Sequence, residues 1–172
     1  YDVEIFETKE KLTLKNGEFD RNTEEDKLFF TASVEDYGDL DGDGKEEAVV
    51  VTLMNTGGTG NFTNGIIFTM KGGKPVILTE FEGGDRAYGG IRSAKIDKGL
   101  LILQQNDVGE AGGACCPEFS VTTMLEWKGG KLVQVGKQER RELYPQTRVK
   151  FEKGKSLAII PISVEKYDRK RF

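Results

Sequence analysis

The residues of this chain best suited to chemistry are the acids of one short run between positions 39 and 47. The run reads Asp39-Leu40-Asp41-Gly42-Asp43-Gly44-Lys45-Glu46-Glu47. Alternate aspartates in a tight loop can direct their carboxylates at one centre, and calcium takes six to eight hard oxygen ligands at about 2.3–2.6 Å. We therefore predict a Ca²⁺ site whose ligands are the carboxylates of Asp39, Asp41, Asp43 and Glu47 and the carbonyl of Lys45. The alternative is a solvated acidic turn that binds no metal.

The spacing of these acids does not fit an EF-hand. An EF-hand closes with a bidentate glutamate at position twelve and lies between helices. Counted from Asp39, position twelve is Val50, which lies inside the β-branched run 48–53. With Gly38 in front, the loop instead resembles the calcium loops of FG-GAP and related extracellular repeats, which precede a strand. In that resemblance Glu47 stands where the repeats usually have aspartate.

Two adjacent cysteines form the second unusual feature, in the run Cys115-Cys116-Pro117. Oxidising surroundings would favour a vicinal disulfide that acts as a rigid turn, and this is the state we predict. Two free thiols, a soft-metal clip or a redox switch remain as alternatives. Two cysteines alone are too few for a tetrahedral zinc site.

Composition limits the classes of function. The 172 residues carry a formal charge of −4 and include 22 glycines and no histidine. The absence of histidine excludes a Ser-His-Asp triad, a Cys-His pair and any imidazole-ligated metal, so we do not expect an enzyme. Nothing in the charge balance indicates a nucleic-acid surface, and no apolar run is long enough to span a bilayer. The chain starts at Tyr1 without a signal-like stretch, so we expect a mature segment of a protein exported from a bacterial-type cell.

Strand and turn signals predict an all-β fold, either an antiparallel meander or sandwich or a barrel-like sheet, with one calcium-binding loop and a C-terminal strand pair. We expect a domain over residues 1–145 and a C-terminal β-strand extension over 146–172, with a short helical turn over 138–143. We expect residues 156–164 to form a very apolar strand, which Pro161 would confine to an edge or a bulge. The predicted strands of the domain cover residues 1–6, 11–15, 28–35, 47–54, 65–70, 75–81, 91–96, 100–105, 119–127 and 132–138.

Two glycine-rich stretches are candidates for recognition. Residues 55–62 lack the Gly-Lys-Ser/Thr ending of a phosphate loop, so a flexible hairpin connection is the simpler interpretation. In residues 83–90, Asp85 and Arg86 either present a polar pair to a ligand or pin the loop. Asp85 together with Glu110 is also the pair of acids that a carboxylate-dependent hydrolase would use.

Several blocks of the chain resemble, in the same order, blocks of uncharacterised secreted bacterial proteins. The resemblance spans residues 1–136 and implies export and calcium binding, but it brings no reaction with it. The blocks are residues 37–51, 55–60, 84–86 and 89–92 and the Cys115-Cys116-Pro117 motif.

These observations predict a secreted, calcium-stabilised structural or assembly protein. It would self-associate as a homo-oligomer or an extracellular polymer by exchanging terminal strands, without nucleic acid and without a membrane span. The first alternative is a monomeric extracellular binding or inhibitor module that uses residues 55–62 and 83–90. The carboxylate-dependent hydrolase ranks last.

Overall fold

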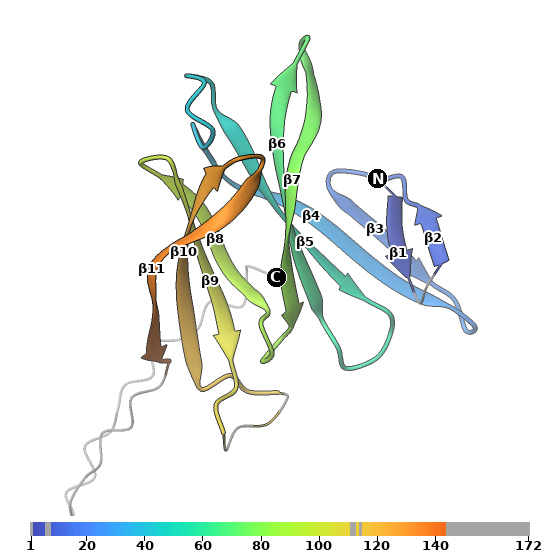
Figure 1. Ribbon diagram of the computed structural model, residues 1–172. Coiled ribbons are helices and arrows are strands. Elements are labelled where there is room, and N and C mark those ends of the chain that lie inside the picture. The colour runs from blue at the N-terminus through green and yellow to red at the C-terminus, as the bar shows by residue number, and fades with distance from the viewer. Residues whose placement is uncertain (1, 6–7, 111–112, 114, 144–172) are drawn as a thin grey trace, which may run out of the picture.

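The computed structural model of the protein describes residues 2–5, 8–110, 113 and 115–143 (Figure 1). This part of the chain contains strands and no helix, and therefore no helix that could cross a membrane. The strands are β1 (Asp2–Ile5), β2 (Thr8–Lys11), β3 (Glu18–Asn22), β4 (Lys27–Gly38), β5 (Glu47–Asn55), β6 (Phe62–Lys71), β7 (Lys74–Asp85), β8 (Ile91–Asp97), β9 (Leu100–Asp107), β10 (Phe119–Lys128) and β11 (Lys131–Glu142).

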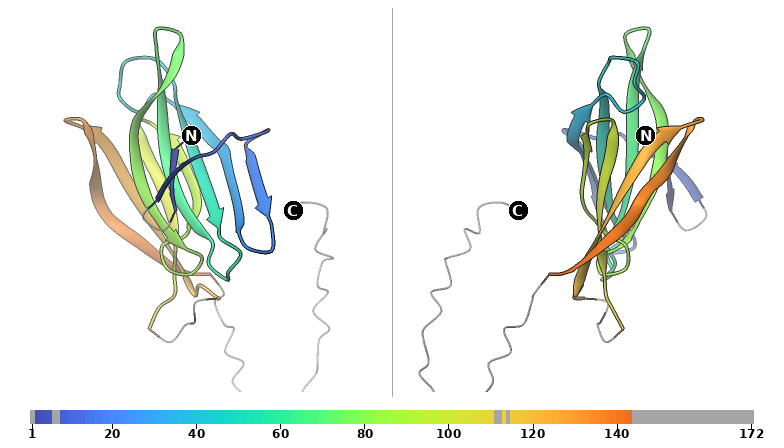
Figure 2. Two further views of the ribbon diagram at one scale, coloured as in Figure 1. Left: turned by 90° about the vertical axis from the view of Figure 1, so that its right-hand side faces the viewer. Right: turned by 60° about the vertical axis from the view of Figure 1, so that its left-hand side comes forward.

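The strands form three antiparallel sheets arranged in layers. A five-stranded sheet has the order β3-β4-β5-β6-β7, a four-stranded sheet has the order β11-β10-β9-β8, and β1 pairs with β2. The four-stranded sheet faces one side of the five-stranded sheet, and the β1–β2 pair lies on the other side (Figures 1 and 2). The all-β prediction is confirmed, and of the architectures considered the structure has the sandwich.

Short turns with left-handed backbone conformations close four hairpins of the described chain. In the first, Asn16 and Gly17 have φ values of 54° and 82°. Such turns match the twist of the flanking strands and favour Asn and Gly at these positions. The other three turns lie at Gly72-Gly73, Lys98-Gly99 and Gly129-Gly130.

The main core lies between the two larger sheets. Side chains alternate between the faces of a strand, so Val49 of β5 and Ile67 of β6 point toward the four-stranded sheet. Each burial of such a side chain contributes about 1.5–3 kcal/mol. The buried members of this core are Leu40, Val49, Ile67, Phe81, Ala94, Leu101 and Leu103.

A second, smaller core lies on the outer face of the five-stranded sheet, the face that turns away from the four-stranded sheet. Leu28 and Phe30 of β4 are each 2 % exposed there, and Leu12 covers them. Leu12 follows β2, so the N-terminal segment acts as a partial third layer. The sequence has three consecutive apolar residues here, Leu28, Phe29 and Phe30, so it shows neither which of them are buried nor that the chain's own N-terminal segment covers them.

The predicted helical turn over residues 138–143 is wrong, because β11 continues to Glu142. Arg140 explains the extended conformation: its Nε lies 2.6 Å from Oδ2 of Asp107, and its guanidinium carbon lies 3.7 Å from the centroid of the Phe119 ring. These cross-strand contacts outweigh the local preference of a charged run for helix. The predicted C-terminal extension, residues 146–172, lies outside the described residues.

Candidate metal centre

The acidic loop joins β4 to β5, two adjacent strands of the five-stranded sheet. The strands pair up to the loop, with Tyr37 opposite Ala48 and Gly38 opposite Glu47. Leu40 is 4 % exposed and anchors the loop in the main core. Gly38 packs closely on the neighbouring sheet, where a Cβ atom would lie 2.6 Å from Cγ2 of Ile96. The base of the loop is therefore fixed, although its tip is exposed.

The loop winds around the carboxylate of Asp39. Oδ1 of Asp39 accepts a hydrogen bond of 2.8 Å from the backbone N–H of Gly42, and Oδ2 accepts one of 3.0 Å from Gly44. Gly42 and Gly44 have φ values of 79° and 84°, which glycine adopts at little steric cost. The two glycines thus permit the bend that turns the next aspartates back toward the first.

The three aspartates converge. Oδ1 of Asp41 accepts a hydrogen bond of 3.0 Å from the N–H of Asp43, whose own Oδ1 accepts one of 2.8 Å from the N–H of Lys45. One carboxylate oxygen from each of Asp39, Asp41 and Asp43 lies within 4.8 Å of the other two. Two oxygens bound to one Ca²⁺ lie at most about 4.6–5.2 Å apart, twice the metal–oxygen distance. The three side chains could therefore hold one metal ion.

Lys45 partly neutralises this cluster. Its Nζ lies 2.8 Å from Oδ2 of Asp43, and both side chains are exposed. The hydrogen bond from the Lys45 ammonium, reinforced by the Lys45 backbone N–H, lowers the pKa of Asp43, and the same bond raises the pKa of Lys45. The contribution of the Lys45 carbonyl to a metal stays a prediction.

Glu47 differs from the other acids because it is completely buried, with 0 % exposure. Its Oε2 accepts hydrogen bonds from the N–H groups of Leu40 (2.9 Å) and Asp41 (3.4 Å). Its Oε1 accepts one of 3.0 Å from the hydroxyl of Thr69. Glu47 lies outside the three-aspartate group, and its predicted role as a ligand stays a prediction. What the geometry does show is that Glu47 ties the loop to β6.

Thr69 was missed by the sequence reasoning. It lies 22 residues after Glu47, and only the pairing of β5 with β6, which sets Ala48 opposite Phe68, brings the two together. No local motif marks such a residue. Thr69 could be predicted only from the register between β5 and β6, and the sequence does not reveal that register.

The sulfurs of Cys115 and Cys116 are joined in a vicinal disulfide in the loop between β9 and β10. Both cysteines are exposed, and the N–H of Cys116 donates a hydrogen bond of 3.0 Å to the carbonyl of Gly113. Asp107 at the start of the loop accepts a hydrogen bond from the N–H of Gly109, which together with Arg140 lowers the pKa of Asp107. Asp107 thus fixes the first turn of the loop between β9 and β10.

The structure brings the two glycine-rich stretches together. Oδ1 of Asp85 accepts hydrogen bonds from the N–H groups of Asn61 (2.7 Å) and Arg86 (2.8 Å). Asp85 therefore pins the two loops to each other. Glu110 is exposed in the β9–β10 loop, and within the described residues no hydrogen bond joins it to Asp85.

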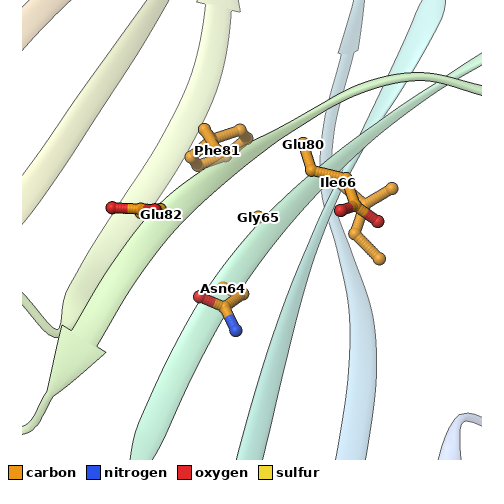
Figure 3. Close-up of a pocket in the computed structure, with 6 residues that line it drawn as sticks. All are labelled: Asn64, Gly65, Ile66, Glu80, Phe81 and Glu82. Carbon is orange, nitrogen blue, oxygen red and sulfur yellow. The ribbon is translucent and has the colours of Figure 1, made fainter. Parts of the chain in front are cut away.

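A cavity of about 410 Å³ lies over β6 and β7 (Figure 3). The ring of Phe81 occupies the space that a side chain at Gly65 would need, which closes this part of the sheet on the core side. Ile66 and Glu80 lie on the opposite side of the two strands (Figure 3). The described residues that line the cavity are Asn64, Gly65, Ile66, Glu80, Phe81 and Glu82.

Comparison of the chain with protein-family models, with curated proteins and with solved structures finds no match. The geometry of the acidic loop and the surfaces around it are therefore the features that indicate a function.

Proposed function

We propose that the protein is an extracellular, calcium-stabilised structural module that self-associates through its terminal strands. The observation that carries the proposal is the convergence of three aspartate oxygens in the loop between β4 and β5. The proposal assigns the protein no catalytic step.

Calcium is the metal that suits this donor set best. Carboxylates are hard donors, which favour Ca²⁺ or Mg²⁺ over softer metals. Mg²⁺ demands near-ideal octahedral geometry and gives up its water reluctantly, whereas Ca²⁺ accepts an exposed loop with irregular ligands. Extracellular calcium modules work at dissociation constants of about 10⁻⁴–10⁻³ M, and a vicinal disulfide is compatible with the same oxidising surroundings.

A structural role follows from the position of the loop. It connects two neighbouring strands of the five-stranded sheet, and Leu40 fastens it to the main core. A cation that binds the folded loop and not the unfolded chain would stabilise the fold by about 2.7 kcal/mol at a concentration 100 times its dissociation constant. The metal would relieve the repulsion among Asp39, Asp41 and Asp43.

Thermal unfolding of the whole chain tests the calcium part of the proposal. We expect calcium to raise the melting temperature by several degrees over EDTA, because it binds only the folded loop. The double substitution Asp41→Asn and Asp43→Asn should abolish the increase. Asp20→Asn, which removes an exposed acid from β3, is the matched control and should keep it. An increase that persists in the loop variant would place the calcium elsewhere.

A second candidate is the extracellular binding module that the sequence also allowed. Two observations favour the binding module. Asp85 joins residues 55–62 and 83–90 into one surface. Nε of Arg86 is buried without a hydrogen-bond partner. This function predicts a monodisperse monomer in sedimentation experiments with calcium. The assembly function predicts larger species under the same conditions.

A further inference from the structure

The outer face of the five-stranded sheet carries several exposed apolar side chains, although Ile66 on the same face is only 1 % exposed. Val49 and Ile67 point into the main core, so their neighbours on β5 and β6 point to the outer face. Strand pairing sets Tyr37, Ala48, Phe68 and Ile77 side by side across four strands. Val34, Val50 and Met70 lie on the same face, next to these four residues. We name the seven residues together the outer patch: Val34, Tyr37, Ala48, Val50, Phe68, Met70 and Ile77.

Four of the seven members of the outer patch are exposed, and Ala48, Val50 and Phe68 between them are half-buried. Tyr37 is 58 % exposed, Val34 51 %, and Met70 and Ile77 48 % each. A contiguous apolar surface of this kind marks an interaction site more often than a scattered hydrophobic residue does. Another part of the same face is covered, since Leu12 buries Leu28 and Phe30 there. The N-terminal segment of the chain therefore already packs on one part of this face.

We propose that the outer patch receives residues 156–164 of a neighbouring copy of the chain. This inference rests on the proposed self-association and names the surface that accepts the terminal strand. The segment reads Ser-Leu-Ala-Ile-Ile-Pro-Ile-Ser-Val and is apolar on both faces of an extended strand. Nine extended residues span about 30 Å, and the distance from β4 to β7 is about 14 Å at normal strand spacing. The segment is long enough to cross the patch. Pro161 has no backbone N–H to donate to a neighbouring strand, and a segment that packs on the face of the sheet does not need that hydrogen bond.

Charge supports the same occupant. Residues 144–172 contain eight Lys or Arg and three Asp or Glu, so they carry +5, and the whole chain carries −4, which leaves −9 on residues 1–143. Four of the basic residues follow the apolar segment, between positions 166 and 171. The acidic loop lies directly beside the patch, because Tyr37 and Ala48 flank it. An apolar strand on the patch would bring its basic end within reach of that loop.

The position of β11 favours a neighbouring copy over the same chain. The described chain leaves β11 at Leu143, on the four-stranded sheet, while the patch lies on the far side of the five-stranded sheet (Figures 1 and 2). The segment of the same chain would have to pass around an edge of the sandwich. Residues 144–155 reach at most about 40 Å when extended, which is enough to hold the segment of one copy against the open face of the next.

Photo-crosslinking of the full chain tests the proposal. Protein carrying p-benzoylphenylalanine in place of Ile159 is mixed with isotopically heavy protein in calcium, irradiated and digested. We expect heavy–light cross-links from position 159 to peptides of β4, β5, β6 or β7, the strands that carry the outer patch. Cross-links within single molecules, or to peptides of the four-stranded sheet, would overturn the proposal.

Sedimentation of surface variants gives a second readout. Val34→Gln with Ile77→Gln should weaken self-association about tenfold or more, because two apolar contacts are lost. Tyr88→Gln, which removes a side chain of similar exposure (54 %) outside the patch, is the control and should change association less than twofold. Unchanged melting temperatures would show that the variants fold. If the wild type sediments as a monomer, the proposed self-association itself fails. If it associates and the patch variant associates equally, only the patch assignment fails.

Discussion

At the scale of single residues, the acids of one loop divide into two kinds. Asp39, Asp41 and Asp43 converge near the surface, where a cation can reach them. Glu47 is sealed inside and is satisfied by two backbone N–H groups and the hydroxyl of Thr69. Buried hydrogen-bonded carboxylates of this kind fix local structure, because removing one leaves several donors without partners.

Glu47→Ala should therefore destabilise the fold by about 3–5 kcal/mol, even without calcium. The substitution leaves three hydrogen-bond donors without an acceptor: the N–H groups of Leu40 and Asp41 and the hydroxyl of Thr69. The measurement is urea unfolding in EDTA. Glu46→Ala, one position earlier and exposed, is the matched control and should change stability by less than about 0.5 kcal/mol. If Glu47→Ala were harmless in EDTA and harmful only with calcium, Glu47 would be a metal ligand and not a structural anchor.

The sequence predicted the three aspartates because their chemistry is encoded by spacing within a few residues. It assigned Glu47 to the same set for the same reason, since Glu47 is the last acid of the run. The partner that gives Glu47 its structural role comes from another strand. Residue roles that depend on strand register, such as that of Thr69, are not visible in a local pattern.

At the scale of elements, β11 shows how cross-strand contacts select a conformation. The run from Lys137 to Glu142 has strong helix formers, yet it continues the strand. Asp107 of β9 bonds Arg140 of β11, and the Arg140 guanidinium lies over Phe119 of β10. One arginine thus connects three strands, and the same Asp107 holds the first turn of the loop that carries the vicinal disulfide.

Asp107 should make stability fall in acid. The N–H of Gly109 and the guanidinium of Arg140 lower its pKa in the folded state below the value of about 3.9 expected in the unfolded chain. The stabilisation is therefore present above pH about 4 and is lost as the pH falls toward the lower, folded pKa. Urea midpoints at pH 6 and pH 3 measure this loss. Asp107→Asn should lose less stability between the two values than the wild type, and Asp20→Asn should match the wild type. An equal loss in all three proteins would contradict this role.

At the scale of the whole molecule, an all-β fold follows from many strands joined by tight turns, and this much was predicted; the sandwich was one of the architectures left open. Asn16-Gly17 and the three similar turns are local, and β5, the middle strand of its sheet, contains the mostly apolar run 48–54. The order of the sheets and the use of the N-terminus as a covering layer are not local. They depend on which of several apolar faces pack together. The residues around Leu28 and Phe30 do not indicate that Leu12 packs on these two side chains.

The molecule as a whole combines an acidic loop that could hold a metal ion, a partly covered outer face and an apolar, basic C-terminal segment. The two proposals connect these parts, because the loop borders the outer patch. The loop is the part on which the others depend, since it fixes the ends of β4 and β5 that carry Val34, Tyr37 and Ala48.

Calorimetric titration of the whole chain with calcium tests the central claim most directly. We predict saturable binding at a single site, with a dissociation constant no weaker than about 10⁻³ M, as for extracellular modules. The binding should be weaker for magnesium and should be lost in the Asp41→Asn and Asp43→Asn variant. A folded protein that shows no saturable binding up to about 10 mM calcium, well beyond that range, would contradict the account.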